Sequence, residues 1–434
     1  MVAQQTYLSV SQALNELLQA FEPLPAEGVR LEEALDRVLA EEIIATSDLP
    51  PFDNSAMDGY AVRAEDLEQA SKKNPVSLAV IGDVPAGAAR LPAIRPGSAV
   101  RIMTGAPLPP GADAVVPVEH TTAPEPMAGR PVTDWVTILD TTTSGNHVRH
   151  AGHDLRAGER VLPAGHRLRP PDIGILAALG ISRPMVHRRP RVAVISTGDE
   201  LVDLDDEMHP GQVRDSNSFA IAAAVRALGA EALRIGRAGD SQQEIVAKLD
   251  TAVRAGVNVI LSTAGVSMGA LDNVRSAVRA RGELTFWKVN MRPGKPVAFG
   301  RYQGVPFVGL PGNPVSALVA FEVLVRPAIL RLSGHRLAER ETLLATLRDG
   351  ISSDGRESYL RARVVWTDRG LEARSVRSQD SSALSSLVEA NALMILPAGV
   401  RAARKGERVR VWLLGAPPSV PTLTEHGRDP RGEG

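Results

Sequence analysis

The chain has 434 residues, too many for one hydrophobic core, and we expect two to four domains. Lysine and arginine together number 49 against 50 aspartate and glutamate residues, which gives no global electrostatic reason to expect a nucleic acid or an anionic membrane as partner. The absence of cysteine excludes disulfide frameworks, thiolate zinc sites and cysteine nucleophiles, so acidic and imidazole side chains remain as candidate metal ligands.

The first 50 residues have the apolar spacing of helices. Leu14, Leu17 and Phe21 fall on one stripe, and a second helix is expected over 31–38 before prolines end the pattern. Polar residues interrupt the first apolar run, which therefore predicts an amphipathic helix and not a signal sequence. No run approaches the roughly 20 apolar residues of a membrane span, so we expect a soluble, cytoplasmic protein.

Residues 51–149 are rich in glycine, proline, valine and threonine and predict a β module inserted into the helical part. Runs such as 77–81 and 135–139 are typical of short strands between turns. Helical spacing resumes at 172–179, which we expect to pack beside the first helices. A helical linking domain is therefore assigned to residues 1–50 and 150–185.

Residues 186–335 alternate between short apolar runs and helical patterns. Strands are predicted at 191–195, 231–235 and 257–261, with helices at 217–228 and 242–255. This order predicts a parallel, doubly wound sheet. Short strands return in 336–415, which we expect to form a small C-terminal β domain, and the proline-containing segment 416–434 is expected to be a disordered tail.

Acidic residues follow several predicted strands of the sheet. Asp199, Glu200, Asp240 and Asp272 lie at or just after strand ends, so their carboxylates are expected at one sheet edge, where open parallel sheets bind ligands. Converging oxygens suit Mg²⁺, which often bridges carboxylates and substrate phosphates. Asp240 has an alternative interpretation as a helix cap before Ser241.

Two loops at the same edge are candidate anion sites. The loop 262–269, which contains Ser267, has glycines and hydroxyls that suit a phosphate, although a plain strand-to-helix turn would also explain it. The loop 310–316, with Pro311 and Pro314, ends a strand and opens a helix, so its amides also face this edge.

A third segment, 286–296, places Lys288, Arg292 and Lys295 within eight positions. Such a cluster can hold a doubly charged oxyanion or phosphates, and a solvated basic turn is the alternative. In the β module, the loop 51–61 with Asp58 is denser in polar residues than one Asx turn requires. Thr104 precedes a turn and is either a functional hydroxyl or a local cap.

Taken together, six motifs resemble the molybdopterin molybdenumtransferase family, which includes the MoeA proteins and the E domain of gephyrin. The motifs are FDNSAMDGYAVR at 52–63, RIMTGAPLPPGADAVV at 101–116, VISTGDEL at 194–201, RDSNS at 214–218, FWKVNMRPGKP at 286–296 and GLPGNPVSAL at 309–318. They are long, they follow the family's order and they run through almost the whole chain, so coincidence does not explain them.

The resemblance implies an elongated homodimer of four-domain chains, in which the sheet domain of one chain meets the β module of the other at the active site. It implies that molybdate is inserted into adenylyl-molybdopterin with release of AMP and with the help of Mg²⁺ or a similar cation. The adenylating enzyme and acceptor molybdoenzymes are further implied partners, and no nucleic acid or membrane is implied.

The family's functional residues carry over to matching positions of this sequence. The implied catalytic residues are Asp58, Thr104, Asp154, Glu200, Asp240 and Asp272, of which the last three also hold the metal. The implied substrate-binding residues are Arg149, Ser267, Lys288, Arg292, Lys295, Pro311 and Pro314, with Ser385 or Ser386 from the last domain. In this division, cations hold molybdate and phosphates, while carboxylates hold the metal.

Two positions depart from the family's pattern. Ala264 stands where a glycine is usual and narrows the ligand loop by a methyl group, and His153 replaces the acidic residue usual before Asp154, which predicts weaker or more pH-dependent metal binding. Three rival functions are a non-catalytic pterin-binding scaffold, a tungstate-inserting homologue and the pterin-adenylating enzyme. The family that adenylates the pterin lacks the β modules, which disfavours the last of these.

Overall fold

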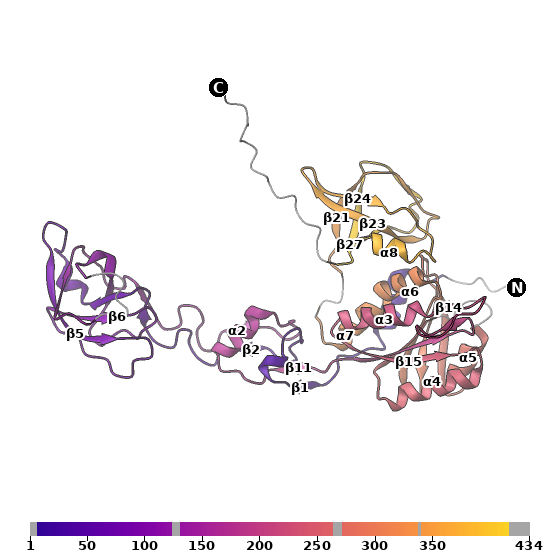
Figure 1. The fold of residues 1–434 in the computed structure, drawn as a ribbon, viewed down its shortest axis with the longest axis horizontal. Helices are drawn as coiled ribbons and strands as arrows, with labels where there is room; N and C mark the ends of the chain where they lie inside the picture. The colour runs from indigo at the N-terminus through magenta and orange to yellow at the C-terminus, as the bar shows by residue number, and fades with distance from the viewer. Residues whose placement is uncertain (1–6, 124–130, 264–270, 337–339, 416–434) are drawn as a thin grey trace, which may run out of the picture.

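The computed structural model of the chain is elongated and describes residues 7–123, 131–263, 271–336 and 340–415 (Figure 1). A β module lies at one end, a narrow linking region follows, and a larger α/β unit with a β domain beside it forms the other end. The predicted fold class is therefore confirmed. The predicted tail, 416–434, lies outside the described residues.

A six-stranded sheet forms the centre of the α/β unit, in the order β15–β12–β16–β20–β19–β17. Its first four strands are parallel: β15 (Glu231–Ala238), β12 (Arg191–Thr197), β16 (Val259–Thr263) and β20 (Val305–Leu310). The sequence did not reveal the antiparallel edge, β19 (Pro296–Tyr302) and β17 (Gly282–Lys288). This edge extends the sheet toward the basic segment.

Helices cover both faces of this sheet. One face carries α3 (Ser216–Ala227), α6 (Pro314–Ala320) and, after a π-helical turn, α7 (Arg326–Leu332), and the other carries α4 (Gln242–Arg254) and α5 (Leu271–Arg279). Successive residues of β12 point to opposite faces, so Val192 and Val194 join the first core while Ala193 and Ile195 join the second. This burial on both faces explains the continuous apolar strands.

The first helix, α1 (Val10–Leu18), packs on the α/β unit and not in the linking region. Its Ala13 and Leu17 are fully buried in the same core as Val315 and Phe321. The predicted apolar stripe is therefore correct, but its partner is the helical layer of the sheet unit. Helical spacing identifies an apolar face and leaves open which surface covers it.

The helix predicted over 31–38 is wrong, because only the 3₁₀ turn η1 (Leu31–Glu33) forms there. On either side of it, β1 (Ala26–Gly28) pairs with β11 (Met185–His187), and β2 (Ile43–Ile44) pairs with β10 (Arg160–Leu162). The helix α2 (Pro170–Ala178) contacts η1, and its buried Leu176 belongs to a different hydrophobic core from Ala13 and Leu17 of α1. Strand pairing with residues far along the chain overrides a weak helical pattern here.

A buried carboxylate organises the linking region. Asp172, only 5% exposed, lies in the first turn of α2 and accepts hydrogen bonds from His166 Nε2 at 2.8 Å and from the Arg169 amide at 2.7 Å. Burial alone would raise the pKa of Asp172, but these bonds and the Arg169 guanidinium outweigh it and lower the pKa from 3.8 to about 2. The ionised carboxylate therefore stabilises the folded state.

We predict that Asp172→Asn lowers the free energy of unfolding at neutral pH by about 2 kcal/mol. Because the folded-state pKa of Asp172 is depressed, its contribution is complete above the unfolded-state value of 3.8 and is lost as pH falls toward about 2. Urea unfolding of parent and variant at several pH values tests this, with Glu42→Gln, at an exposed ion pair with Arg160, as the control. A gap between parent and variant that stays constant down to the acid limit would contradict the prediction.

Two further β units complete the chain. The β module contains a sheet in the order β7–β4–β6–β5–β8, whose strands are β4 (Gly59–Val62), β5 (Val76–Val84), β6 (Ser98–Ile102), β7 (Ala114–Pro117) and β8 (Trp135–Ile138). The C-terminal domain contains β21 (Leu343–Leu347), β23 (Glu357–Thr367), β24 (Gly370–Ser375), β25 (Ala392–Leu396) and β27 (Arg408–Leu413). Pairing of β23 with β25 closes this last sheet on itself. Among the described residues, no helix is long and apolar enough to cross a membrane.

Candidate functional site

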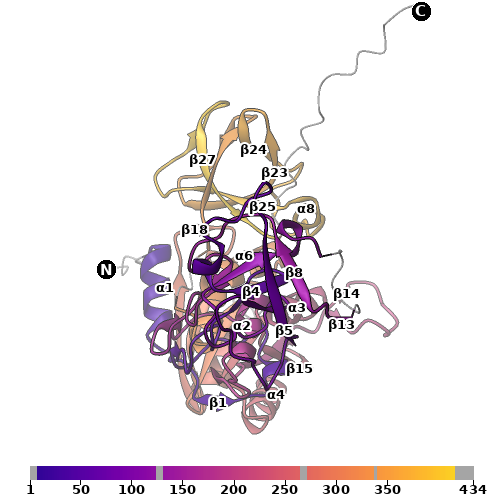
Figure 2. The same ribbon diagram turned by 90° about the vertical axis from the view of Figure 1, so that its left-hand side faces the viewer.

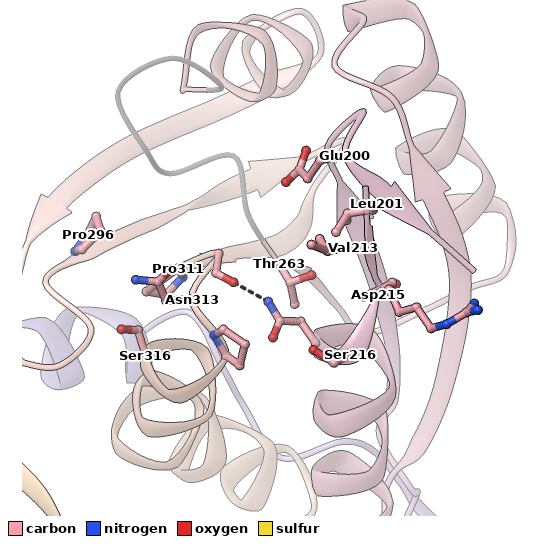
Figure 3. Close-up of a pocket in the computed structure, with 14 residues that line it drawn as sticks. Glu200, Leu201, Val213, Asp215, Ser216, Thr263, Pro296, Pro311, Asn313 and Ser316 are labelled. Atoms are coloured by element: carbon pink, nitrogen blue, oxygen red, sulfur yellow. Dashed lines mark hydrogen bonds between the residues drawn. The ribbon is translucent and has the colours of Figure 1, made fainter. Parts of the chain in front are cut away.

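A cavity of about 590 Å³ opens at the carboxyl edge of the parallel strands (Figure 3). Glu200 and Thr263 reach it from the ends of β12 and β16, and the loop after β20 closes another side. Its walls include the predicted residues Glu200, Pro311 and Pro314, together with Asp215, Asn217 and Asn313. The sheet edge inferred from the strand order is therefore hollowed as a ligand site would be.

Glu200 lies folded back against the end of β12. A Cβ atom at Gly198, whose φ is +141°, would lie only 2.4 Å from Glu200 Oε2. Two physical reasons therefore favour glycine at position 198: the positive φ of the backbone, and the space that the Glu200 carboxylate occupies. Any side chain at this position would displace the Glu200 carboxylate from the cavity wall.

Asp240 follows β15 at the same edge, and its backbone amide donates to Asp199 Oδ1 at 3.0 Å. The cap of α4 is Ser241, whose hydroxyl accepts from the Glu244 amide, so the alternative interpretation of Asp240 as the helix cap is wrong. Asn273, in α5, donates its side-chain amide to the Asp240 carbonyl at 2.6 Å. This hydrogen bond connects α5 to the turn that follows β15. Asp240 is thus positioned by its backbone, and its carboxylate is not used as the cap of α4.

The predicted metal set is only partly described. Ser267, Ala264 and their loop lie outside the described residues, and of Asp272 only the backbone, in α5, is described. Within the described part of the chain, no group of three His, Asp or Glu side chains is arranged to hold a metal ion. Glu200 and Asp240 follow neighbouring strands, and Asp199 and Asp215 lie at the same edge, so several carboxylates are close to the cavity. Carboxylates suit Mg²⁺ when substrate phosphates supply further ligands.

A second cavity, of about 410 Å³, adjoins the first and shares Pro296 and Ser316 with it. Four basic side chains line it, namely Arg292, Lys295, Arg356 and Arg361. Asp380 is its one acidic wall residue among the described residues, and hydrogen bonds from the Ser382 amide and hydroxyl lower the pKa of its carboxyl. The excess of positive charge favours an oxyanion.

Arg361 is the most buried of these cations, at 1% exposure. Its guanidinium donates to Ser386 Oγ at 3.1 Å and to the Asp380 carbonyl at 2.9 Å. Burial, with a smaller contribution from Arg292, lowers the pKa of Arg361 to about 10, so it remains charged at neutral pH. No role was predicted for Arg361, although an arginine inside the largely apolar run 360–366 was an available signal.

Two hydrogen bonds fix the loop 312–314, and the second of them joins the walls of the two cavities. Asn217 Nδ2 donates to the Gly312 carbonyl at 2.6 Å (dashed line in Figure 3), and Asn313 Nδ2 donates to Ser381 Oγ at 2.9 Å. Ser381, and not Ser385, therefore lines the basic cavity, while Ser385 is exposed at the start of α8 (Ser385–Glu389). The Ser386 hydroxyl accepts a hydrogen bond from Arg361. Of the two serines predicted to contribute from the last domain, Ser386 therefore acts on the basic cavity only through this arginine.

Asp215 is a second residue to which the sequence analysis assigned no role. Its buried carboxylate caps α3 by accepting from the Ser218 amide at 3.0 Å, and it also accepts from Ser196 Oγ at 2.7 Å. The RDSNS motif was a usable signal, because Asp before a helix is a favoured cap. Asp215 thereby fixes the helix start, including Asn217, beside the cavity.

Lys288 ends β17 and lines neither cavity, although its charge acts on the phenol of Tyr7. Lys295 lies 4.8 Å from the centre of the same ring. The pKa of Tyr7 is lowered, mainly by a hydrogen bond with Lys295. Desolvation opposes this effect, and the charges of Lys295 and Lys288 add to it. The predicted basic trio is therefore divided, with Arg292 and Lys295 in the basic cavity and Lys288 beside the N-terminal segment.

The β-module residues form a separate group. Asp58 Oδ1 accepts from the Thr104 amide at 2.7 Å and from its hydroxyl at 2.8 Å, so Thr104 holds Asp58 in place. Arg149, in β9 (Val148–Arg149), pairs with Asn54 of β3 (Asn54–Ser55), and the Asp154 amide donates to the Leu49 carbonyl. Within one chain the β module, which carries Asp58, Thr104 and Arg149, lies at the opposite end of the molecule from the α/β unit, and Asp154 belongs to the linking segment between β9 and β10 (Figure 1). A single chain does not bring the two groups together.

Fold and cavities define a multidomain α/β protein with a candidate ligand site at the edge of a parallel sheet and a basic cavity beside it. Family models match three consecutive parts of the chain: the MoeA N-terminal region (domain I and II) over residues 8–180, a probable molybdopterin binding domain over 193–331, and the MoeA C-terminal region (domain IV) over 344–414. The chain belongs to the MoeA family of molybdopterin molybdenumtransferases.

Curated relatives match over nearly their whole length. The chain is 41% identical to molybdopterin molybdenumtransferase 2 of Mycobacterium tuberculosis, over 92% of this chain and 97% of the relative. It is 35% identical to the molybdopterin molybdenumtransferase of Haemophilus influenzae, over 90% and 94%. The solved structure of a molybdopterin biosynthesis MoeA protein from Pyrococcus horikosii has a TM-score of 0.80 and 34% identity, covering 95% of this chain and all of that one.

Proposed function

We propose that this chain is a molybdopterin molybdenumtransferase, which inserts molybdate into adenylyl-molybdopterin and releases AMP to complete the molybdenum cofactor. The observation that carries the proposal is the adjacency of two different cavities. One is lined by the carboxylates and loops of the sheet edge, the other by four cations, and they share Pro296 and Ser316. The names of the relatives agree with this activity.

The basic cavity suits molybdate, a compact oxyanion with two negative charges. Arg292 and Lys295 come from the sheet unit, whereas Arg356 and Arg361 come from the C-terminal domain. The four charges exceed those of Asp380, in the wall, and of Asp354, which pairs with Arg356, so a dianion is stabilised between them. Arginine forks and a lysine give donors on several sides of a tetrahedral ion.

The larger cavity suits the adenylated pterin. The loop Gly312–Pro314, fixed by Asn217 and Ser381, presents main-chain groups at its wall, and Thr263 adds a hydroxyl from the strand end. The shared wall holds the reacting group of the pterin next to the molybdate. Positioning of the two substrates, rather than a side-chain nucleophile, then dominates the rate.

Glu200, Asp240 and Asp272 would hold Mg²⁺ together with the substrate's phosphates. When bound, the cation counters the negative charge that develops as the phosphoanhydride is cleaved and AMP leaves. The structural support is that Gly198 makes room for the Glu200 carboxylate and that Ser241 relieves Asp240 of capping α4. Both observations support a role for these two carboxylates as ligands of the cation.

We further propose that the active site is completed in a homodimer. Asp58, Thr104, Arg149 and Asp154 are polar and exposed, and the β module that carries the first three is far from the sheet edge of its own chain (Figure 1). Figure 2, which looks along the long axis, shows the β module projecting in front of the rest of the chain and not folded back beside it. A second chain would supply the missing half of each site through a two-fold arrangement.

The test is an assay of AMP release with purified protein, adenylyl-molybdopterin, Mg²⁺ and molybdate, coupled to reconstitution of a cofactor-free molybdoenzyme. We predict molybdate-dependent AMP release, and a loss of about 1000-fold in the Glu200→Gln variant. Glu207→Gln, at an exposed residue of the same loop region that does not line the cavity, is the matched control.

Substrate binding without turnover in the parent would support the rival scaffold function and refute the proposal. Replacing molybdate with tungstate in the same assay decides the metal preference, because the two ions share charge and shape. If the Glu200→Gln variant and the parent released AMP at the same rate, Glu200 would have no role in the reaction.

A further inference from the structure

A buried chain of hydrogen bonds connects the cap of α3 with the wall of the larger cavity. Asp215 Oδ2 accepts from Ser196 Oγ at 2.7 Å, and Ser196 Oγ lies 3.2 Å from Thr263 Oγ1. Ser196 and Thr263 are register partners in the parallel strands β12 and β16, so their side chains point to the same face of the sheet. Thr263 and Asp215 both line the cavity (Figure 3). A carboxylate that caps a helix is thus linked to a hydroxyl in the wall of the ligand site.

The carboxylate fixes the direction of every hydrogen in this chain. A carboxylate only accepts, so the hydrogen of the Ser196 hydroxyl points to Asp215. Because a hydroxyl has one hydrogen, Ser196 must accept in its contact with Thr263, which is its second partner in the chain. The Thr263 hydrogen therefore points to Ser196, and the lone pairs of Thr263 Oγ1 are left for a group in the cavity.

The contacts on the other side of Asp215 have the same polarity. Ser218 Oγ donates to Asp215 Oδ2 at 2.6 Å and accepts from Arg234 Nε at 3.0 Å, and the Ser218 amide donates to Asp215 Oδ1. An arginine side chain only donates, so the hydrogen of Ser218 cannot turn toward it. Asp215 is therefore the acceptor in which the hydrogen bonds from both sides end.

Burial makes this polarity firm. Asp215 is 4% exposed, Thr263 is 1% exposed and Ser196 is fully buried, so water competes little for their hydrogen bonds. In such an environment a hydroxyl turned the wrong way leaves a buried donor or acceptor without its partner, which is unfavourable. A ligand that meets Thr263 is therefore bound best when it brings a hydrogen-bond donor to this position.

We infer that Asp215 is a positioning residue, which acts through Ser196 to make Thr263 a hydrogen-bond acceptor for the substrate. The inference rests on the proposed function and names the part of the substrate that lies at Thr263. That part carries an N–H or O–H donor, from the pterin ring or from the adenosine, because the phosphate oxygens between them offer only lone pairs. The phosphates therefore lie away from Thr263.

Asp215→Asn reverses the chain without removing the helix cap. The asparagine oxygen still accepts from the Ser218 amide, as a good cap does, while its NH₂ group replaces Oδ2 and donates to Ser196. The hydrogens of Ser196 and Thr263 then turn round, and Thr263 meets the substrate's donor with a donor. We expect the affinity for adenylyl-molybdopterin, measured by equilibrium binding without Mg²⁺, to fall about thirtyfold. Loss of a negative charge would by itself strengthen the binding of an anion, so a weaker complex cannot be a charge effect.

Thr263→Val removes the acceptor and should weaken binding about tenfold in the parent, whereas Thr263→Ser should keep most of the affinity. In the Asp215→Asn background, Thr263→Val should cause no further loss, because the hydroxyl that it removes already opposes the ligand. Two independent structural defects would add instead. Thr251→Val is the matched control, since the Thr251 hydroxyl donates to the Ala247 carbonyl within α4 and does not line the cavity.

Binding of AMP and of 6-hydroxymethylpterin, each measured alone, distinguishes the two sources of the donor. Weaker binding of AMP to Thr263→Val assigns the donor to the adenosine, and weaker binding of the pterin assigns it to the pterin ring. Parental affinity for adenylyl-molybdopterin in Asp215→Asn, or additive losses in the double variant, would overturn the inference. If the parent binds this substrate but releases no AMP with molybdate, the proposed function fails, while the comparison of affinities still decides the role of Asp215.

Discussion

Mixing two inactive variants, Asp58→Ala and Glu200→Ala, is expected to restore about a quarter of the parental rate of AMP release. The reason is that the β-module group and the sheet edge lie at opposite ends of one chain (Figure 1). If each active site takes Asp58 from one chain and Glu200 from the other, half of the randomly formed dimers are mixed. Each mixed dimer then has one intact site and one doubly defective site.

The measurement requires subunit exchange before the assay, followed by AMP release from the mixture and from each variant alone. A chain that carries both substitutions, mixed with an equal amount of parent, is the control. Every mixed dimer then has two singly defective sites, so subunit exchange should lower the rate from about half to about a quarter of the parental value. The composite site is refuted if the mixture of single variants stays as inactive as either alone while the proteins exchange subunits.

Arg361→Met is expected to have the second-largest effect, lowering the free energy of unfolding of the C-terminal part by about 3 kcal/mol and weakening molybdate binding at least tenfold. The guanidinium is almost fully buried and donates to Ser386 Oγ and to the Asp380 carbonyl. Without it, the Asp380 carbonyl loses this donor, and the loop that carries Ser381 loses its anchor. Ser381 in turn accepts from Asn313, at the wall shared with the sheet unit.

Thermal unfolding and molybdate titration measure the two parts of this prediction. Arg361→Lys should recover part of the binding, because it keeps the charge, but little of the stability, because an ammonium group cannot reproduce the fork of donors. Arg363→Met, two positions along β23 at an exposed residue, controls for the loss of an arginine from this strand. An Arg361→Met variant that unfolds and binds like this control would exclude the proposed role.

Part of the candidate site could be predicted from short segments of the sequence. A polar turn follows each apolar strand of the α/β unit, and parallel strands place such turns at one edge, so Glu200, Asp240 and the 311–314 loop were found correctly as neighbours of this edge. Arg292 and Lys295 were found from charge density within one short segment. In both cases the signal lies within a few residues.

The remaining part depended on contacts between distant segments. The periodicity of residues 10–18 identified an apolar face, but only the folded chain shows that α1 covers the α/β unit; at 31–38, pairing of the flanking strands left a single 3₁₀ turn. Arg361 contacts residues 17 to 25 positions away, and Asn217 contacts one 95 positions away.

By itself, the sequence determined the alternation of strands and helices, the polar strand ends and the family, because each of these is encoded by side-chain type at short spacing. Tertiary structure decided which charges share a cavity and which lie apart, because burial and convergence are properties of segments far apart in the chain. Asp58 and Glu200 show the difference: both are recognisable in the sequence, yet only the folded shape puts the β module and the α/β unit that carry them at opposite ends of one chain.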